Sequence, residues 1–255
     1  METPDVDRTL TLLWRRTLGT PQGSRGPKQR VSVDEVIRAG IAVADAEGLP
    51  AFSLRKVVDR LGLKLMSIYT YVPGRSELIG LMVDEVAGER ELPALSGTWA
   101  ERLTTVAEQL WEEFHRHPWL LQVDESRPWL GPHLSDRYEW QLSAIEGAGF
   151  TDLEMDQTIT LISEYVAAAA RTSVNTRRTA ERSGMSDAQW WEINAPILER
   201  VMPADAYPIS GRVGQAAGME YNALGDPDRS FRFGLERILD GLADLLNRPG
   251  RPARP

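Results

Sequence analysis

The chain has 255 residues, a length that fits one large domain or two smaller ones. Its composition, 42% hydrophobic and 26% charged, is typical of a folded globular protein and excludes wholesale disorder. The lack of cysteine excludes disulfides, thiolate nucleophiles and zinc sites with cysteine ligands, and fits a reducing cytoplasm. No apolar stretch approaches the ~18 residues of a membrane span, so we expect a cytoplasmic chain with no membrane partner.

The net charge of −8 is unevenly distributed along the sequence. Residues 1–75 carry a net charge of +4, whereas residues 76–255 carry −12. Between Asp7 and Asp34 there are six arginines and lysines and no acidic residue. This asymmetry predicts a small cationic module that binds a polyanion, joined to an acidic body with a different role.

The first element is expected to be a flexible basic arm over residues 1–30. Residues 20–30 are rich in glycine, proline and basic side chains, and only 10–16 are suited to a short helical turn. A cationic arm of this kind binds phosphates or enters a minor groove of DNA. The candidate contacts are Arg25, Lys28 and Arg30.

A helical domain is predicted over residues 31–88. Ser32 and Glu35 have the spacing of a capping box, in which each side chain bonds the other's backbone amide, and a first helix follows them. Gly48 and Pro50 end this helix.

Two short helices joined by a glycine-containing turn come next, the arrangement of a helix-turn-helix. Ser53 caps the first, which ends at Gly62, and the second covers 65–71. In such a unit the second helix enters the major groove and the first crosses the DNA backbone. A further helix is predicted from 75 to 88, after the break at Pro73 and Gly74.

The remaining chain, residues 89–250, is predicted to be an acidic helical body. Thr98, Thr151 and Ser186 each begin a capping box. We expect helices from about 99 to 117, 133 to 146, 152 to 182, 187 to 200 and 227 to 247. The glycine- and proline-rich residues 202–227 are expected to be a mobile connection. The predicted fold class is therefore all-α, a small helix-turn-helix domain followed by a larger helical domain.

The sequence of residues 53–84, SLRKVVDRLGLKLMSIYTYVPGRSELIGLMVD, resembles the tetracycline-repressor (TetR) family of bacterial regulators. The resemblance rests on the L-G turn, the I-Y-x-Y-V end of the second short helix and the P-G-x-x-E-L start of the next. The body matches more weakly, through the HPW of 117–119 and the RPWLGPH of 127–133.

The resemblance implies a DNA-binding role for specific positions. Arg55 and Lys56 lie on the first short helix, and Arg55 matches a position that contacts DNA. The positions implied to face bases are Lys64, Leu65, Met66, Ser67 and Thr70, and those implied to contact phosphates are Tyr69, Tyr71 and Arg75. Because Leu65 and Met66 are apolar, base recognition is expected to depend on thymine methyl groups and on Arg55.

Two apolar stripes in the body are candidates for a dimer interface. Phe231, Leu235, Ile238, Leu242 and Leu245 form a helical seam near the C-terminal end, which either receives a partner helix or is buried within one chain. The longest predicted helix carries a second stripe at Ile159, Ile162, Val166 and Ala170. The resemblance implies that these helices form a two-fold homodimer, which fits a palindromic DNA operator.

Tryptophan is frequent in the body, where aromatic side chains belong either to the core or to a ligand pocket. The positions implied by the resemblance to bind a small-molecule effector are Trp111, His115, Trp119, Trp129, His133, Trp140, Tyr165 and Ala169. His115 and His117 lie two residues apart, which does not suit a helical metal site, and we expect neither metal nor cofactor.

Three functions compete at this stage. The favoured one is a ligand-responsive transcriptional repressor. An enzyme is disfavoured, because the sequence lacks nucleotide-binding glycine loops, metalloprotease and nucleophile-elbow motifs. The remaining alternative is a helical adaptor or a non-catalytic binding protein that acts through the C-terminal domain.

Overall fold

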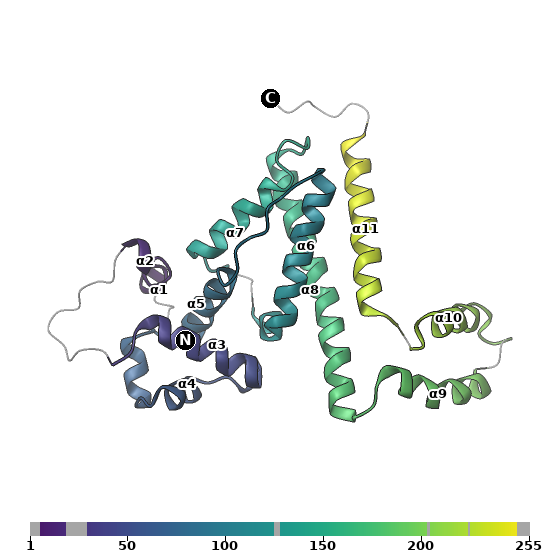
Figure 1. Ribbon diagram of the computed structural model, residues 1–255, viewed down its shortest axis with the longest axis horizontal. Coiled ribbons are helices and arrows are strands. Elements are labelled where there is room, and N and C mark those ends of the chain that lie inside the picture. The colour runs from purple at the N-terminus through teal and green to yellow at the C-terminus, as the bar shows by residue number, and fades with distance from the viewer. Residues whose placement is uncertain (1–5, 19–29, 125–127, 203–204, 224, 249–255) are drawn as a thin grey trace. The chain divides into compact units, whose positions relative to one another are not determined.

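The computed structural model describes residues 6–18, 30–124, 128–202, 205–223 and 225–248 (Figure 1). The described chain is helical and has no strand, which confirms the predicted all-α class. Its elements are α1 (Val6–Leu13), α2 (Arg15–Leu18), α3 (Val33–Glu47), η1 (Leu49–Ala51), α4 (Leu54–Leu61), η2 (Leu65–Thr70), α5 (Arg75–Ala87), α6 (Trp99–Arg116), η3 (Pro118–Gln122), α7 (Pro132–Ser143), α8 (Asp152–Ser183), α9 (Asp187–Val201), α10 (Pro208–Tyr221) and α11 (Pro227–Leu246).

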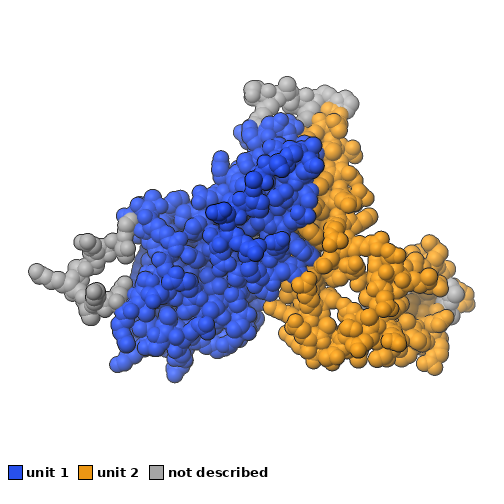
Figure 2. Space-filling model, viewed as in Figure 1, with its two compact units in different colours: residues 1–159 blue, residues 160–255 orange. Residues whose placement is uncertain are grey.

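The helices form two compact units, divided between Ile159 and Thr160 inside α8 (Figure 2). The first unit contains the helix-turn-helix and the helices up to α7. The second contains most of α8 together with α9, α10 and α11. The predicted domain boundary at residue 89 lies within the first unit and stays a prediction.

The predicted capping boxes are present and fix where the helices begin. At the start of α3, the Glu35 amide donates to Ser32 Oγ (3.1 Å) and the Ser32 amide donates to Glu35 Oε2 (2.6 Å). The hydrogen bond from the Ser32 backbone lowers the pKa of Glu35, because it stabilises the carboxylate. The same reciprocal pattern begins α6 at Thr98, α8 at Thr151 and α9 at Ser186.

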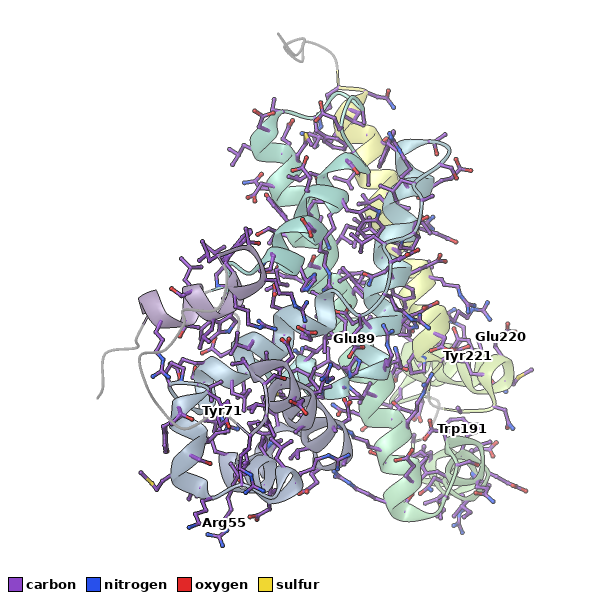
Figure 3. The ribbon with its side chains drawn as sticks, turned by 60° about the vertical axis from the view of Figure 1, so that its left-hand side comes forward. Arg55, Tyr71, Glu89, Trp191, Glu220 and Tyr221 are labelled. Atoms are coloured by element: carbon purple, nitrogen blue, oxygen red, sulfur yellow. The ribbon has the colours of Figure 1, made fainter. Side chains whose placement is uncertain are left out.

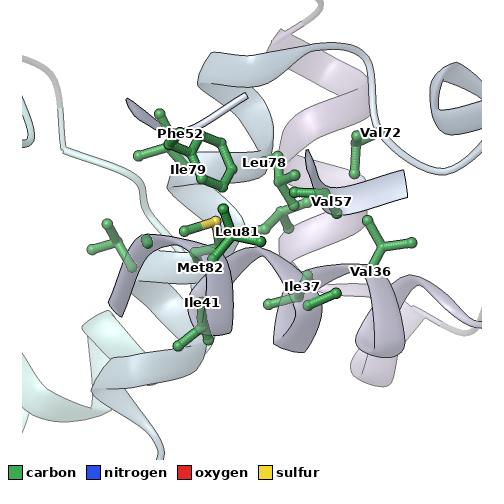
Figure 4. Packing of buried hydrophobic residues seen from close by; sticks show 14 of the residues in the cluster. Val36, Ile37, Ile41, Phe52, Val57, Val72, Leu78, Ile79, Leu81 and Met82 are labelled. Carbon is green, nitrogen blue, oxygen red and sulfur yellow. The ribbon is translucent and has the colours of Figure 1, made fainter. Parts of the chain in front are cut away.

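A continuous apolar core holds α3, α4, η2 and α5 together. Val36 and Ile37 of α3 and Leu78 of α5 are completely buried in it (Figure 4). Gly40 lets α3 approach α5 closely, because a Cβ atom there would lie 2.7 Å from the sulfur of Met82. Burying side chains of this size stabilises a fold by about 1.5–3 kcal/mol each. The core therefore fixes the frame on which the helix-turn-helix is built.

The N-terminal part of the chain differs from the expected flexible arm. Residues 6–18 form α1 and α2, and Leu13 is 3% exposed within the core of the helix-turn-helix domain. The prediction gave weight to the basic charge of this stretch. Leu12, Leu13 and Trp14, however, supply an apolar edge that packs against the core.

Two further elements differ from expectation. The second short helix of the helix-turn-helix, predicted over 65–71, is a 3₁₀ helix over Leu65–Thr70. The expected connection between 202 and 227 contains helix α10, with Pro208 in its first turn and Asn222 in the left-handed conformation at its end. The prediction of a connection relied on the glycines inside 208–221. A glycine costs a helix only about 1 kcal/mol, and α10 forms although it contains three of them.

Candidate nucleic-acid interface and ligand cavity

The helix-turn-helix is built around the turn at Gly62. Gly62 ends α4 in the left-handed conformation, with φ 63° and ψ 32°, which glycine adopts without strain. The amide of Leu63 then donates to the carbonyl of Val58 (2.9 Å) and directs the chain into η2. Ile68, completely buried, anchors η2 against α4, so the opposite side of η2 faces outward.

The outward side of η2 is apolar and aromatic. Met66 is 74% exposed, and Leu65 and Tyr69 are exposed as well. The hydroxyl groups of Ser67 and Thr70 donate to carbonyls of their own element, those of Lys64 (2.6 Å) and Ser67 (2.7 Å). Their oxygens are left to accept hydrogen bonds, and the exposed methyl and aromatic groups suit contact with thymine methyls.

Arg55 of α4 is an exposed cation. Its side chain is 74% exposed and points away from the domain (Figure 3), with only a 3.8 Å ion pair to Asp59. Lys64, at the start of η2, and Arg30, ahead of α3, are exposed too. Lys56 differs, because its ammonium group donates to a carboxylate oxygen of Glu47 and to the carbonyl of Ala51.

Tyr71 and Arg75, two of the predicted phosphate contacts, make contacts within the domain instead. Tyr71 is 4% exposed, so its ring belongs to the core and not to the outer surface. Arg75 donates to the carbonyls of Leu49 (3.0 Å) and Phe52 (3.3 Å), and its guanidinium lies over the Phe52 ring. Arg75 thus fastens α5 to the η1 turn. Arg25 and Lys28 lie outside the described residues.

The second unit contains an open cavity of about 920 Å³. Its walls come from the second half of α8, the start of α9 and the start of α11. Two of the eight predicted ligand residues, Tyr165 and Ala169, line it. The lining also includes residues that the prediction missed, namely the aromatic Trp190 and small or polar residues, among them Ala168, Thr172, Asn175, Thr176, Asp187, Asp226 and Ser230.

Tyr165 is held firmly at the edge of this cavity. Its hydroxyl donates to the carbonyls of Phe231 (2.8 Å) and Ser230 (3.0 Å), and its ring stacks on Phe231. Gly234 makes this contact possible, because a Cβ atom there would lie 2.2 Å from the Tyr165 hydroxyl. Burial raises the pKa of Tyr165, so the hydroxyl stays protonated and the aromatic wall stays neutral.

The missed lining residues did leave a sequence signal. On α8, the buried stripe repeats at Ile162, Val166 and Ala170. A second stripe of small and polar residues repeats at Ala168, Thr172 and 176, on a different side of the helix. Only the fold shows that this second stripe lines a cavity and is not an ordinary solvated face.

The other predicted ligand residues lie in the first unit and do not line this cavity. Trp119 is completely buried, and its indole nitrogen donates to Asp45 Oδ1 (2.8 Å), so it is a core residue. Trp129 and His133 lie against α5, where they contact Gly80 and Gly88. The rest are partly buried side chains with local partners: Trp111 and His115, whose rings are in contact, and Trp140, whose indole donates to Pro93.

The predicted dimer stripes are largely buried within the single chain. Ile159, Ile162, Val166 and Ala170 of α8 are 4% exposed or less, and Phe231, Leu235 and Leu242 of α11 are 8% exposed or less. Ile238 and Leu245 are partly buried. Much of the α11 seam is therefore buried within one chain, and the assignment of both stripes to a dimer interface stays a prediction. The exposed large apolar side chains of these helices are different ones, Leu153, Leu161 and Phe233.

The described residues contain neither a cluster of metal ligands nor a membrane-spanning helix. No group of three or more potential ligands from His, Asp and Glu lies close enough together there to hold a metal ion. Over the same ranges, no helix combines the length and the apolar character that crossing a membrane needs.

Comparison with known proteins points in one direction. A family model described as "Tetracyclin repressor-like, C-terminal domain" matches residues 92–246. The HTH-type transcriptional repressor DrrR1 of Streptomyces coeruleorubidus is 41% identical over 244 residues, which cover 95% of this chain and 87% of DrrR1.

Solved structures agree with this match. The TetR family protein ActR of Streptomyces coelicolor, in complex with actinorhodin, superimposes with a TM-score of 0.71 and 27% identity, covering 87% of this chain and 99% of ActR. The apo form of ActR gives a TM-score of 0.67 and 26% identity, with 86% and 100% covered.

Proposed function

The chain belongs to the tetracycline-repressor family, and on this premise we propose that it is a ligand-responsive repressor that binds a palindromic operator as a homodimer. A small, mostly apolar or aromatic effector releases it from the DNA. The observation that carries the proposal is the exposed outer side of η2, with Arg55 beside it and a buried core behind it.

The charge distribution supports DNA binding by the N-terminal part of the chain. The net charge of +4 over residues 1–75 attracts the phosphate backbone, and the −12 of the remainder disfavours non-specific contact elsewhere. Arg55 on α4 and Lys64 directly before η2 are exposed cations of the helix-turn-helix. A global net charge of −8 is therefore compatible with a DNA-binding protein.

Exposed apolar surface in the second unit supports a homodimer. Helix α9 has no buried residue, and Trp190, Ile193, Ile197 and Val201 follow one another at helical spacing with 39–64% exposure. Apolar surface of this extent marks an interaction site. A second copy is the partner that a palindromic operator requires, because two-fold symmetry places one reading element on each half-site.

The cavity beside Tyr165 supports an effector site. Its volume of about 920 Å³ lies within the range of small-molecule pockets. Tyr165 and Trp190 offer aromatic surface, and Asn175 and Thr176 offer hydrogen-bonding groups. The relative ActR was crystallised with actinorhodin, and we propose an aromatic effector for this chain as well.

Selection of duplexes from a random DNA pool tests the DNA-binding part of the proposal. The full-length protein is expected to enrich a palindrome, and light scattering is expected to give a dimer alone and one or two dimers on each selected duplex. A chain that enriches no duplex refutes the repressor and leaves the adaptor as the surviving alternative.

Titration with actinorhodin then tests the aromatic effector class. We expect it to lower operator affinity in a mobility-shift assay, because an effector that prefers one conformation shifts the population away from the DNA-bound one. Asn175→Ala, which removes a hydrogen-bonding group of the cavity and lies outside the exposed row of α9, should weaken this response, whereas Arg248→Gln, just after α11, should leave it unchanged. Tight binding with unchanged operator affinity would contradict the proposed regulation.

A further inference from the structure

The N-terminal helices α1 and α2 contact three separate parts of the first unit. Neither helix extends the helix-turn-helix itself, which begins at α3. Helix α1 is nevertheless fixed by burial, because Thr9 and Leu13 are each 3% exposed, whereas α2 has no buried residue and is held by polar contacts. These contacts extend from η2, which we call the reading element because it is proposed to face the bases, to the start of α7.

The first contact is with the reading element. Arg8 of α1 donates from Nη2 to the carbonyl of Tyr69 (3.0 Å), and Tyr69 lies on the outward side of η2. A guanidinium bound to a backbone carbonyl holds the backbone of η2 and leaves the Tyr69 ring exposed. The position of η2 is therefore tied to α1.

The second contact is with the frame of the domain. Arg15, with a side chain 10% exposed, donates from Nε to Asp34 of α3 (2.9 Å), and Arg16 donates from Nη2 to Glu85 of α5 (2.9 Å). Burial raises the pKa of Asp34, but the hydrogen bond and charge of Arg15 and the charge of Arg16 outweigh it, so the net pKa is lowered. These ion pairs join α2 to both α3 and α5.

The third contact is with residues 129–133, which we call the strap, and which lead into α7. The indole nitrogen of Trp14 donates to the carbonyl of Leu130 (2.8 Å). Arg16 Nη1 lies 3.1 Å from Nε2 of His133. Because a guanidinium only donates, the His133 nitrogen is the acceptor.

The strap itself lies against α5 at three successive points. Gly80 and Asp84 of α5, and Gly88 directly after it, meet Trp129, Gly131 and His133 in that order. A Cβ atom on Gly80 or Gly88 would lie within 2.4 Å of the strap side chain that it meets.

Asp84 closes this contact at the start of α7. Its carboxylate, 3% exposed, accepts a hydrogen bond from the amide of Leu134 (3.0 Å) and therefore caps α7 from another helix. A Cβ atom on Gly131 would lie 2.1 Å from Asp84 Oδ1, so this approach requires glycine. The strap and α7 thus move with α5, and α2 holds the outer side of the same strap.

We propose that α1 and α2 are a clasp that couples the reading element to the strap and α7, with Trp14 and Arg16 as the positioning residues at the strap end. The clasp deepens the proposed function, on which its regulatory role rests. A change at the start of α7 then reaches η2 by two connections, through α5 and through the clasp. By linkage, fixing η2 on DNA must also change the stability of the strap.

Hydrogen exchange of the full-length protein tests this reciprocity, with and without a duplex selected from the random pool. In the wild type, the duplex is expected to slow exchange in peptides covering 128–135. Trp14→Phe keeps an aromatic ring and removes the donor to Leu130, and Arg16→Gln removes the Glu85 and His133 contacts. Both variants should keep operator affinity within about two-fold of the wild type and show a clearly smaller response at the strap, because only the connection through α5 is then intact. Arg248→Gln, which also removes one arginine, should respond like the wild type.

Two outcomes overturn the clasp: variants that respond as strongly as the wild type, or a wild type with no response at the strap. If no duplex is selected at all, the proposed function fails. The clasp is then tested by hydrogen exchange of the protein without DNA. There, Trp14→Phe should speed exchange over 128–135 by about five-fold, the factor for one lost hydrogen bond. Equal exchange in wild type and Trp14→Phe would refute the contact.

Discussion

Helices α3 and α9 begin in the same way but differ in burial. Each has 15 residues and a capping box, formed by Ser32 with Glu35 and by Ser186 with Gln189. Seven residues of α3 are buried, whereas α9 has none. Both carry apolar residues at helical spacing, including Ile37 in one and Ile197 in the other.

The difference between α3 and α9 shows that where a helix begins and whether it is buried have separate causes. A capping box satisfies the first amides of a helix and so decides where it starts. Burial depends on whether another element presents a complementary surface. Helix α3 meets α5 across Gly40, whereas α9 meets α10 where Trp191 lies against Gly218 and still buries none of its residues. Helices of this length gain most of their stability from packing. We therefore expect α9 to depend on a second copy.

The largest expected effect comes from removing one apolar side chain from each helix. Ile37→Ala should lower the free energy of unfolding by about 2–5 kcal/mol, because a cavity replaces a completely buried side chain. Ile197→Ala, at 44% exposure, should cost no more than about 0.5 kcal/mol under conditions where the chain is monomeric. Chemical denaturation measures both, and equal losses would remove the distinction between the two helices.

Arg55→Ala should have the next largest effect, on DNA binding. We expect a loss of about 1–3 kcal/mol if Arg55 contacts a base, or a uniform loss with a salt slope smaller by about one if it contacts a phosphate. Mobility shifts with the selected duplex at several salt concentrations distinguish the two. Arg90→Ala, which removes an exposed arginine paired with Glu112 in the body, is the matched control. Unchanged affinity and unchanged base preference in Arg55→Ala would exclude it from the interface.

Removing the two caps should have smaller and unequal effects. Ser32→Ala is expected to cost about 0.5–2 kcal/mol of global stability, because α3 cannot lose its first turn without disturbing the core. Ser186→Ala removes the same kind of hydrogen bond, yet the monomer should lose helicity locally with little change in the global transition. Denaturation together with hydrogen exchange over 186–192 checks this, and a global loss as large as that of Ser32→Ala contradicts it.

The smallest effect is a pH dependence within the helix-turn-helix unit. Burial raises the pKa of Asp84, so its contribution to stability is complete below the ordinary carboxyl pKa of about 4 and is lost as the pH rises through the folded pKa. Asp84→Asn keeps an oxygen that accepts from Leu134 and has no proton to lose. The variant should therefore gain stability relative to the wild type as the pH rises from about 4 to 7.

Asp34 provides a control of opposite sign. Arg15 and Arg16 lower its pKa despite its burial, so its contribution is present above the ordinary carboxyl pKa and is lost as the pH falls through the lower folded pKa. Asp34→Asn should accordingly be most destabilising near pH 7 and least below pH ~3. Denaturation curves for the two variants that stay parallel to the wild type across this range would disprove both assignments.

The local features of this chain could be predicted from its sequence. Capping residues, the left-handed glycine at Gly62 and the apolar stripe of α3 act over one or two helical turns, so they reveal α3, α4, α5 and the start of α9 directly. The L-G turn and the I-Y-x-Y-V segment gave the family, which the comparisons support. The charge asymmetry predicted which end of the chain binds DNA.

Only the tertiary structure decided what each apolar or basic residue contacts. Trp119 and Phe231 are aromatic residues of the kind that line pockets and interfaces, and the fold buries both in a single chain. Arg8 and Arg16 have the charge of a DNA-binding arm, and the fold pairs them with Tyr69 and Glu85. Charge and hydrophobicity belong to a residue by itself, but a partner 61 or 69 positions away is brought near only by the packing of the whole domain.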